Sequence, residues 1–109
     1  MRLRQVALAA SDLEKVTSTL CEVFGLSAGY HDPGVAVFGL ENVVLPVGQQ
    51  FLEVVSPVRD DAPARRYLER RGGDCGYMVM LQTDDWDADR ARAERLGMRV
   101  VWTGELPDI

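Results

Sequence analysis

Apolar positions alternate, and then recur at helical spacing, in the first part of the chain. The run "LRQVALA", residues 3–9, alternates with a period of two and predicts a short strand. A helix is predicted directly after it, because Ser11 as N-cap and Glu14 three residues later form a capping box. Its apolar stripe has spacings of three and four and consists of Leu13, Val16, Leu20 and Phe24. Gly25 is expected to end the helix, with Phe24 anchored in the core.

The pattern changes to that of strands between residues 34 and 57. Three short apolar runs, "VAVFGL", "NVVLPV" and "QFLEVVS", are separated by the turn-like segments "EN" and "VGQ". Connections this short leave no room for crossover helices, so an antiparallel meander is predicted. The next stretch, "DDAPARRYLERRGG", is typical of a helix with Pro63 in its first turn and a glycine stop.

The second half of the chain repeats the plan of the first. Residues 76–83 predict a strand, Asp84 or Asp85 caps a helix, and "MRVVW", residues 98–102, predicts a final strand. The residues expected to face inward from this helix are Ala88, Ala91 and Leu96, with Trp86 as a core anchor at its entry. The segments "QVALAASDLEKVTSTLCEVFGL" and "MVMLQTDDWDADRARAERLGM" share strand, acidic cap, helix and glycine at similar spacing.

Composition narrows the class of protein and of partner. The chain is 47% hydrophobic and 27% charged, as in an ordinary soluble domain, and no apolar run reaches the length of a membrane span. A net charge of −5 argues against nucleic acid and membrane partners and favours a cationic guest. Cys21 and Cys75 are too few for a disulfide framework, and a cytoplasmic location is expected.

The duplicated plan resembles the vicinal oxygen chelate superfamily, also called glyoxalase/bleomycin-resistance/dioxygenase-like. Within it, the chain looks most like the methylmalonyl-CoA epimerase-like members. The resemblance is strongest in "FLEVVSPVRDDAPARRYLERRGG" and "MLQTDDWDADRARAERLGMRVV". It implies an α+β fold in which paired βαβββ modules form a cupped, partly closed sheet, the second module lacking its last two strands. The whole chain, residues 1–109, is then one glyoxalase-like domain: module one at 1–57, a linking helix at 58–73 and an incomplete module two at 74–109.

Metal-dependent members of the superfamily hold a divalent ion on the concave face of the sheet. In this sequence the histidine of their first strand falls on Gln5, and the carboxylate or amide of module one falls on Glu53. The histidine that opens module two falls on Met78, and the epimerase's acid/base glutamate falls at about Val37. A thioether suits only soft ions, and two oxygen donors without an imidazole make a weak site. No metal and no cofactor are therefore expected, and no catalytic residue is assigned.

Six residues are the candidates for binding a ligand, namely Gln5, Phe38, Glu53, Met78, Met80 and Trp102. Two interpretations of Glu53 stay open: an acceptor that orients a ligand, or a structural carboxylate bonded to Gln5 or Tyr77.

The two methionines lie either in the core or on a pocket wall. The resemblance puts Met78 and Met80 on the cavity face, with Val79 and Leu81 packed on the helices. Polarizable, adaptable methionines would suit an apolar ligand.

The residues and the resemblance leave three hypotheses for the function. The first is a metal-free protein that binds a small organic molecule, to sequester or to sense it. The second is a metal-dependent lyase, isomerase or dioxygenase of the same superfamily with noncanonical or missing ligands. The third is an interaction module that has lost its site. Because the shortened second module would leave an exposed sheet edge, which natural proteins avoid, a homodimer is expected unless the chain is part of a longer protein.

Overall fold

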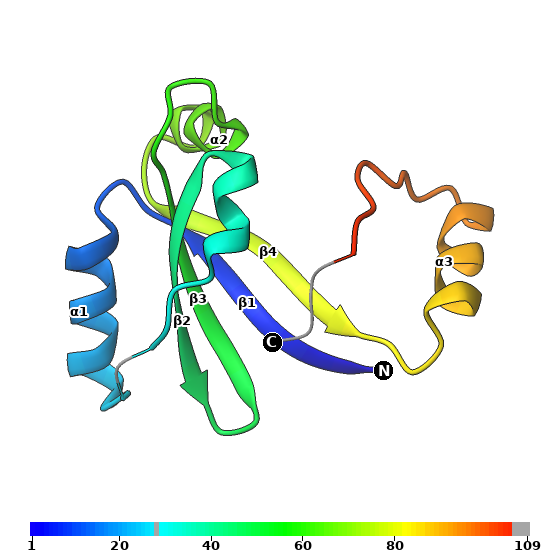
Figure 1. Cartoon of the computed structure of the whole chain (residues 1–109), viewed down its shortest axis with the longest axis horizontal. Coiled ribbons are helices and arrows are strands. Elements are labelled where there is room, and N and C mark those ends of the chain that lie inside the picture. The colour runs from blue at the N-terminus through cyan, green and yellow to red at the C-terminus, as the bar shows by residue number, and fades with distance from the viewer. Residues whose placement is uncertain (28, 106–109) are drawn as a thin grey trace.

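The chain folds around one mixed sheet of four strands (Figure 1). The computed structural model describes residues 1–27 and 29–105. Its elements, in chain order, are β1 (Arg2–Ala9), α1 (Leu13–Phe24), the 3₁₀ helix η1 (Pro33–Phe38), β2 (Leu40–Val47), β3 (Gln50–Pro57), α2 (Pro63–Arg71), β4 (Cys75–Gln82) and α3 (Trp86–Arg95). The strand order is β2-β3-β1-β4; β1 is parallel to β3, and the other neighbours are antiparallel. The open sheet has the expected α+β class and does not close into a barrel.

Helices cover both faces of the sheet. Since consecutive strand residues point to opposite faces, neighbouring residues of one strand pack in different clusters. Val54 belongs to the cluster under α1, whose buried members are Ala10, Leu13, Val43, Leu45 and Val54. Val55 belongs to the cluster under η1 and α2, whose buried members are Ala9, Leu40, Val55, Ala64 and Leu68. Glu53, two residues before Val55, therefore shares the face that η1 and α2 cover.

Helix α1 begins one residue later than the capping-box pattern predicts. Asp12 is the N-cap, and its Oδ1 accepts a hydrogen bond from the backbone N of Lys15 at 3.1 Å. The backbone N of Ser11 donates instead to Asp74 Oδ1 at 2.9 Å. Phe24, the predicted core anchor at the other end of α1, is exposed, because it lines an open groove beside Leu26 and Phe51.

Replacing the cap tests this assignment. We expect Asp12→Ala to lower the free energy of unfolding by about 1 kcal/mol, the usual cost of losing an N-cap side chain. Ser11→Ala should cost less than half of that, since the Ser11 side chain caps nothing in α1. Urea unfolding of the two variants measures the difference, and a larger loss for Ser11→Ala would contradict the assignment.

The predicted three-stranded meander is wrong in its first strand. Residues 33–38 form η1, because Pro33 fits the first helical turn, Asp32 Oδ1 accepts from Gly34 N, and Gly39 ends the helix in the left-handed region. The segment "EN", predicted as a turn, lies inside β2. Among the described residues, only an isolated bridge between Tyr30 and Val44 adds to the β2 edge. The meander is thus the hairpin β2–β3.

Module two departs further from its prediction. Helix α3 begins after its predicted cap, Asp85, whose Oδ1 accepts from the backbone N of Ala88. It buries none of its residues, so the inward face predicted for Ala88, Ala91 and Leu96 is wrong, and Trp86 is no core anchor. Residues 98–102 form no strand. Helix α3 and residues 98–102 depart from the prediction for the same reason. The described sheet has no strand beyond β4 on which their apolar side chains could pack.

Val79 and Leu81 of β4 are also exposed, although they were predicted to pack on the helices. In the described residues, no helix is long and apolar enough to cross a membrane.

Candidate functional site

Glu53 lies at the centre of a polar network on the face of the sheet that η1 covers. Its side chain is nearly buried, with 4% of the residue's surface exposed. Glu53 Oε1 accepts a hydrogen bond from Gln5 Nε2 at 3.0 Å, and Oε2 accepts one from Asn42 Nδ2 at 2.6 Å. The sequence left Gln5 and Tyr77 as possible hydrogen-bond partners of Glu53. Gln5 makes this hydrogen bond, whereas Tyr77 packs edge-to-face on Tyr67.

Asn42 extends the network to the loop before η1. Its Oδ1 accepts from the backbone N of Asp32 at 2.8 Å, and its backbone oxygen accepts from His31 Nδ1 at 2.6 Å. Asn42 is buried, and both ends of its amide are satisfied, as buried polar groups require. Sequence reasoning missed Asn42. The available signal was a lone amide at the start of the apolar run "NVVLPV".

Burial raises the pKa of the Glu53 carboxyl above its ordinary value. The hydrogen bonds from Asn42 and Gln5 favour the charged form and oppose part of this rise, while the charge of Asp32 adds to it. Glu53 is thus a carboxyl held by two amide donors in a site that disfavours its ionisation.

The raised pKa makes stability depend on pH in a defined direction. Folded Glu53 holds its proton to higher pH than unfolded Glu53, so this group's contribution is fully present below about pH 4, the unfolded range. It is lost as the pH rises through the folded pKa. The quantity to follow is the free energy of unfolding of the wild type minus that of Glu53→Gln. We expect this difference to fall as the pH rises above about 4 and then to level off. Urea unfolding at successive pH values measures it; a difference that grows with pH would contradict the assignment.

The two methionines of β4 lie beside this network. Pairing between β1 and β4 places Met80 opposite Gln5 and Met78 opposite Ala7, and pairing between β1 and β3 places Glu53 on the other side of Ala7. Opposite residues of paired strands share a face. Gln5, Glu53, Met78 and Met80 therefore surround Ala7 on one surface, with Met78 exposed and Met80 half-buried.

The aromatic candidates form a second group on the same side of the sheet. Phe38 of η1 and Trp102 pack edge-to-face with ring centroids 5.2 Å apart. Val35 of the same helix packs against the cluster that contains Val55, which places η1 on the Glu53 face. Val37, where the resemblance would put an acid/base glutamate, is an exposed apolar residue of η1.

These residues do not fit a divalent metal. Both carboxylate oxygens of Glu53 accept hydrogen bonds from amides, and the Gln5 nitrogen is used in one of them. Met78 offers a thioether, which hard and borderline divalent ions bind poorly. Within residues 1–27 and 29–105, no three His, Cys, Asp or Glu side chains lie close enough to hold an ion together.

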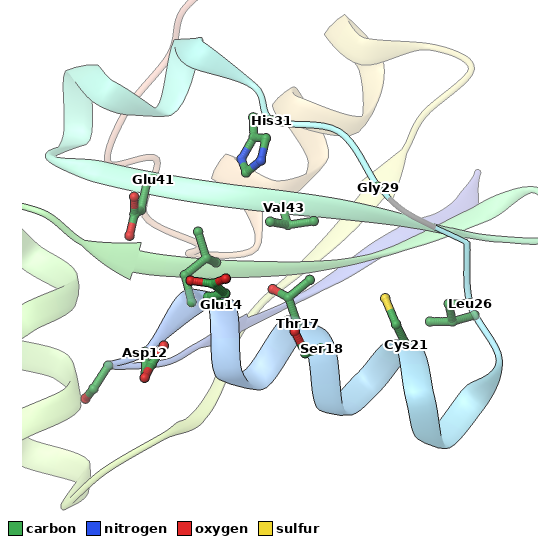
Figure 2. A pocket seen from close by; sticks show the side chains of 12 residues that line it. Asp12, Glu14, Thr17, Ser18, Cys21, Leu26, Gly29, His31, Glu41 and Val43 are labelled. Carbon is green, nitrogen blue, oxygen red and sulfur yellow. The ribbon is translucent and has the colours of Figure 1, made fainter.

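Two grooves are lined by described residues, and the larger lies on the α1 side of the sheet, opposite the face of Glu53. One, of about 450 Å³, is bordered by Gln5 together with apolar residues that include Leu3, Phe24, Val47 and Phe51. The other, of about 850 Å³, lies between α1 and β2, and its lining includes Glu14, His31, Glu41, Leu26 and Val43 (Figure 2). Gln5 links the smaller groove to the Glu53 network, whereas the larger one borders none of the six candidates.

Comparisons with known proteins agree with this architecture. A family profile described as a glyoxalase-like domain matches residues 6–106. A variant of methylmalonyl-CoA epimerase from Streptomyces coelicolor, in complex with 2-nitronate-propionyl-CoA, has a TM-score of 0.83 and 21% identity over 94% of this chain and 76% of its own. Methylmalonyl-CoA epimerase from Mycobacterium tuberculosis has a TM-score of 0.82 and 19% identity over 93% of this chain and 67% of its own. A hypothetical protein from Bacillus halodurans has a TM-score of 0.80 and 14% identity over 88% and 68%. Among curated protein sequences, none matches.

Proposed function

This chain belongs to the glyoxalase-like domain family, and from that premise we propose that it binds a small organic molecule without a metal, to sequester or to sense it. The ligand lies on the surface around Ala7, between the Glu53 network and the two methionines of β4. One observation carries the proposal: Glu53, at the position of a family metal ligand, has both oxygens bonded to amides. A cytoplasmic location and a homodimer are parts of the same proposal.

The chemistry of the surface defines the ligand class. Met78 and Met80 offer polarizable contact to an apolar or aromatic body. The buried carboxylate and a net charge of −5 favour a ligand that carries a positive charge or N–H donors. Sites of this kind combine mainly apolar walls with a few fixed polar groups.

A thermal-shift panel tests the proposal. The panel contains aromatic organic cations, such as benzyltrimethylammonium and berberine, and propionyl-CoA, which is related to the ligand of a structural neighbour. At least one probe should raise Tm in the presence of a chelator, because a ligand that binds only the folded state stabilises it. Met78→Lys, at an exposed position, should abolish the shift of the cationic probes, because the ammonium group replaces the thioether contact and repels a cation; the matched control Val101→Lys should keep the shift. A flat response across the whole panel would contradict the proposal.

A second candidate function is an enzyme of the same family, and the raised pKa of Glu53 favours it, since shifted carboxyls serve as general acids or bases. Such an enzyme would exchange the α-proton of propionyl-CoA with deuterated solvent. Mass spectrometry measures the exchange, and a loss in Glu53→Gln would assign the proton transfer to this carboxyl.

A further inference from the structure

The groove of about 850 Å³ between α1 and β2 has no part in the function proposed above. It lies on the α1 side of the sheet, whereas the Glu53 network lies on the side that η1 and α2 cover. One wall is a single face of α1, because the residues it contributes recur at helical spacing, namely Glu14, Thr17, Ser18 and Cys21. The other wall consists of β2 and of the loop that precedes η1, with Glu41 and His31 among its residues.

Backbone contacts hold the loop wall against the edge of β2. Tyr30 N donates to Val44 O at 3.0 Å, and Val44 N donates to Tyr30 O at 2.8 Å. A Cβ at Gly29 would collide with the backbone oxygen of Val44, so only glycine allows the loop to approach this closely. The groove therefore has walls that the fold itself keeps in place.

The groove presents carboxylates and acceptors that the chain does not neutralise. Within the described residues, neither Glu14 nor Glu41 forms an ion pair, and the lining contains no lysine or arginine. His31 Nδ1 lies 2.6 Å from the backbone oxygen of Asn42. Because a carbonyl oxygen only accepts, Nδ1 carries the proton of the neutral ring, and Nε2 is left as an acceptor.

A buried hydroxyl in the α1 wall also lacks a partner. Thr17 Oγ1 is buried and forms no hydrogen bond with any described residue. The side chains of Glu14, Thr17 and Cys21 project from α1 toward β2 (Figure 2). Buried polar groups in folded proteins are nearly always hydrogen-bonded, so an unpartnered hydroxyl beside a groove indicates a molecule that binds there.

We propose that this groove binds a small aliphatic diamine, with one ammonium group at Glu14 and Thr17 and the other at Glu41. An ammonium group has N–H donors and no acceptor, which complements carboxylates and unpartnered acceptors. The two carboxylates stand on opposite walls, so each takes its own ammonium group. Leu26 and Val43 in the lining offer apolar surface to the alkyl chain between them.

This site does not depend on the ligand proposed for the other face of the sheet. A Tm shift that Met78→Lys removes belongs to the surface around Ala7. A shift that the double variant Glu14→Gln, Glu41→Gln removes belongs to the groove. Either proposal therefore fails without the other.

Calorimetric titration of the chain with 1,5-diaminopentane tests the site. We expect one diamine to bind per chain. Pentylamine, which has one ammonium group, should bind at least about tenfold more weakly, and uncharged 1,5-pentanediol should not bind.

Charge-matched variants separate the groove from the overall charge of the chain. Glu14→Gln, Glu41→Gln should weaken diamine binding at least about tenfold. The matched control is Glu22→Gln, Glu69→Gln, which removes as many charges from exposed positions outside the groove. It should keep the affinity within about twofold. Circular dichroism of both variants verifies that the fold is retained.

Alkylation of the wild-type cysteines by iodoacetamide locates the bound diamine. Cys21 lines the groove, whereas Cys75 lies outside it, and both are half-buried. Saturating diaminopentane should slow alkylation of Cys21 and leave that of Cys75 unchanged, as mass spectrometry of the peptides measures. No binding of the diamine, or equal losses of affinity in the two double variants, would overturn the proposal. Binding that leaves the reactivity of Cys21 unchanged would overturn it as well.

Discussion

Asn42→Ala should lower the free energy of unfolding by about 3 kcal/mol. The change removes the 2.6 Å hydrogen bond to Glu53 and leaves one oxygen of a buried carboxylate without a donor. It also removes the acceptor of the Asp32 backbone N–H. The loss of stability exceeds that of an ordinary hydrogen bond, because the Glu53 carboxylate and the Asp32 backbone N–H lose their Asn42 partner at once.

Urea unfolding near neutral pH measures this loss. The matched control is Gln49→Ala, which removes an exposed amide in the β2–β3 turn and should change stability by less than about 0.5 kcal/mol. The loss in Asn42→Ala should shrink at low pH, where Glu53 is protonated and no charge is left without a donor. Equal losses in the two variants would contradict the role given to Asn42.

Restoring two imidazoles should turn the surface around Ala7 into a metal site. In the double variant Gln5→His, Met78→His, two imidazoles share the face of the sheet with Glu53, residue 78 lying across Ala7 from it, and Oε1 of the Glu53 carboxylate is freed from its amide donor. Two imidazoles and a carboxylate are the ligands of many catalytic zinc sites. We expect Zn²⁺ or Co²⁺ to bind at least about 100-fold more tightly than to the wild type.

Calorimetric titration with each metal measures the gain. The matched control is Gln5→His, Val79→His, which carries as many imidazoles but places one on the opposite face of the sheet. It should gain less than a tenth of the affinity gained by the double variant. Equal gains in the two variants would show that the register around Ala7 does not determine metal binding.

Local patterns predicted most of the elements, because strand alternation and helix caps depend on neighbours in sequence. The four observed strands and three α-helices overlap segments predicted with the right type. The failures have physical causes beyond the local pattern. "VAVF" has strand-like composition, but Pro33, the Asp32 cap and Gly39 favour a 3₁₀ helix. "MRVVW" has an equally strand-like composition, yet it lacks a described strand with which to pair.

The site was predictable only in the part that the family resemblance aligns with this sequence. The resemblance located Gln5, Glu53 and Met78, and the structure brings these three together around Ala7. Asn42 could not be located in this way, because its link to Glu53 depends on the pairing of β2 with β3 and on the path of the loop at Asp32. Contacts between strands depend on tertiary structure, which periodicity does not encode.

The most direct test of metal-free binding is a titration of the wild-type chain with the panel probe that raises Tm most, in the presence of a chelator and then with added Zn²⁺. We expect the same Kd, within about twofold, in both buffers, because the proposed binding surface around Ala7 would contact the probe through side chains and would need no metal. Binding that disappears with the chelator and returns with Zn²⁺ would contradict metal-free binding.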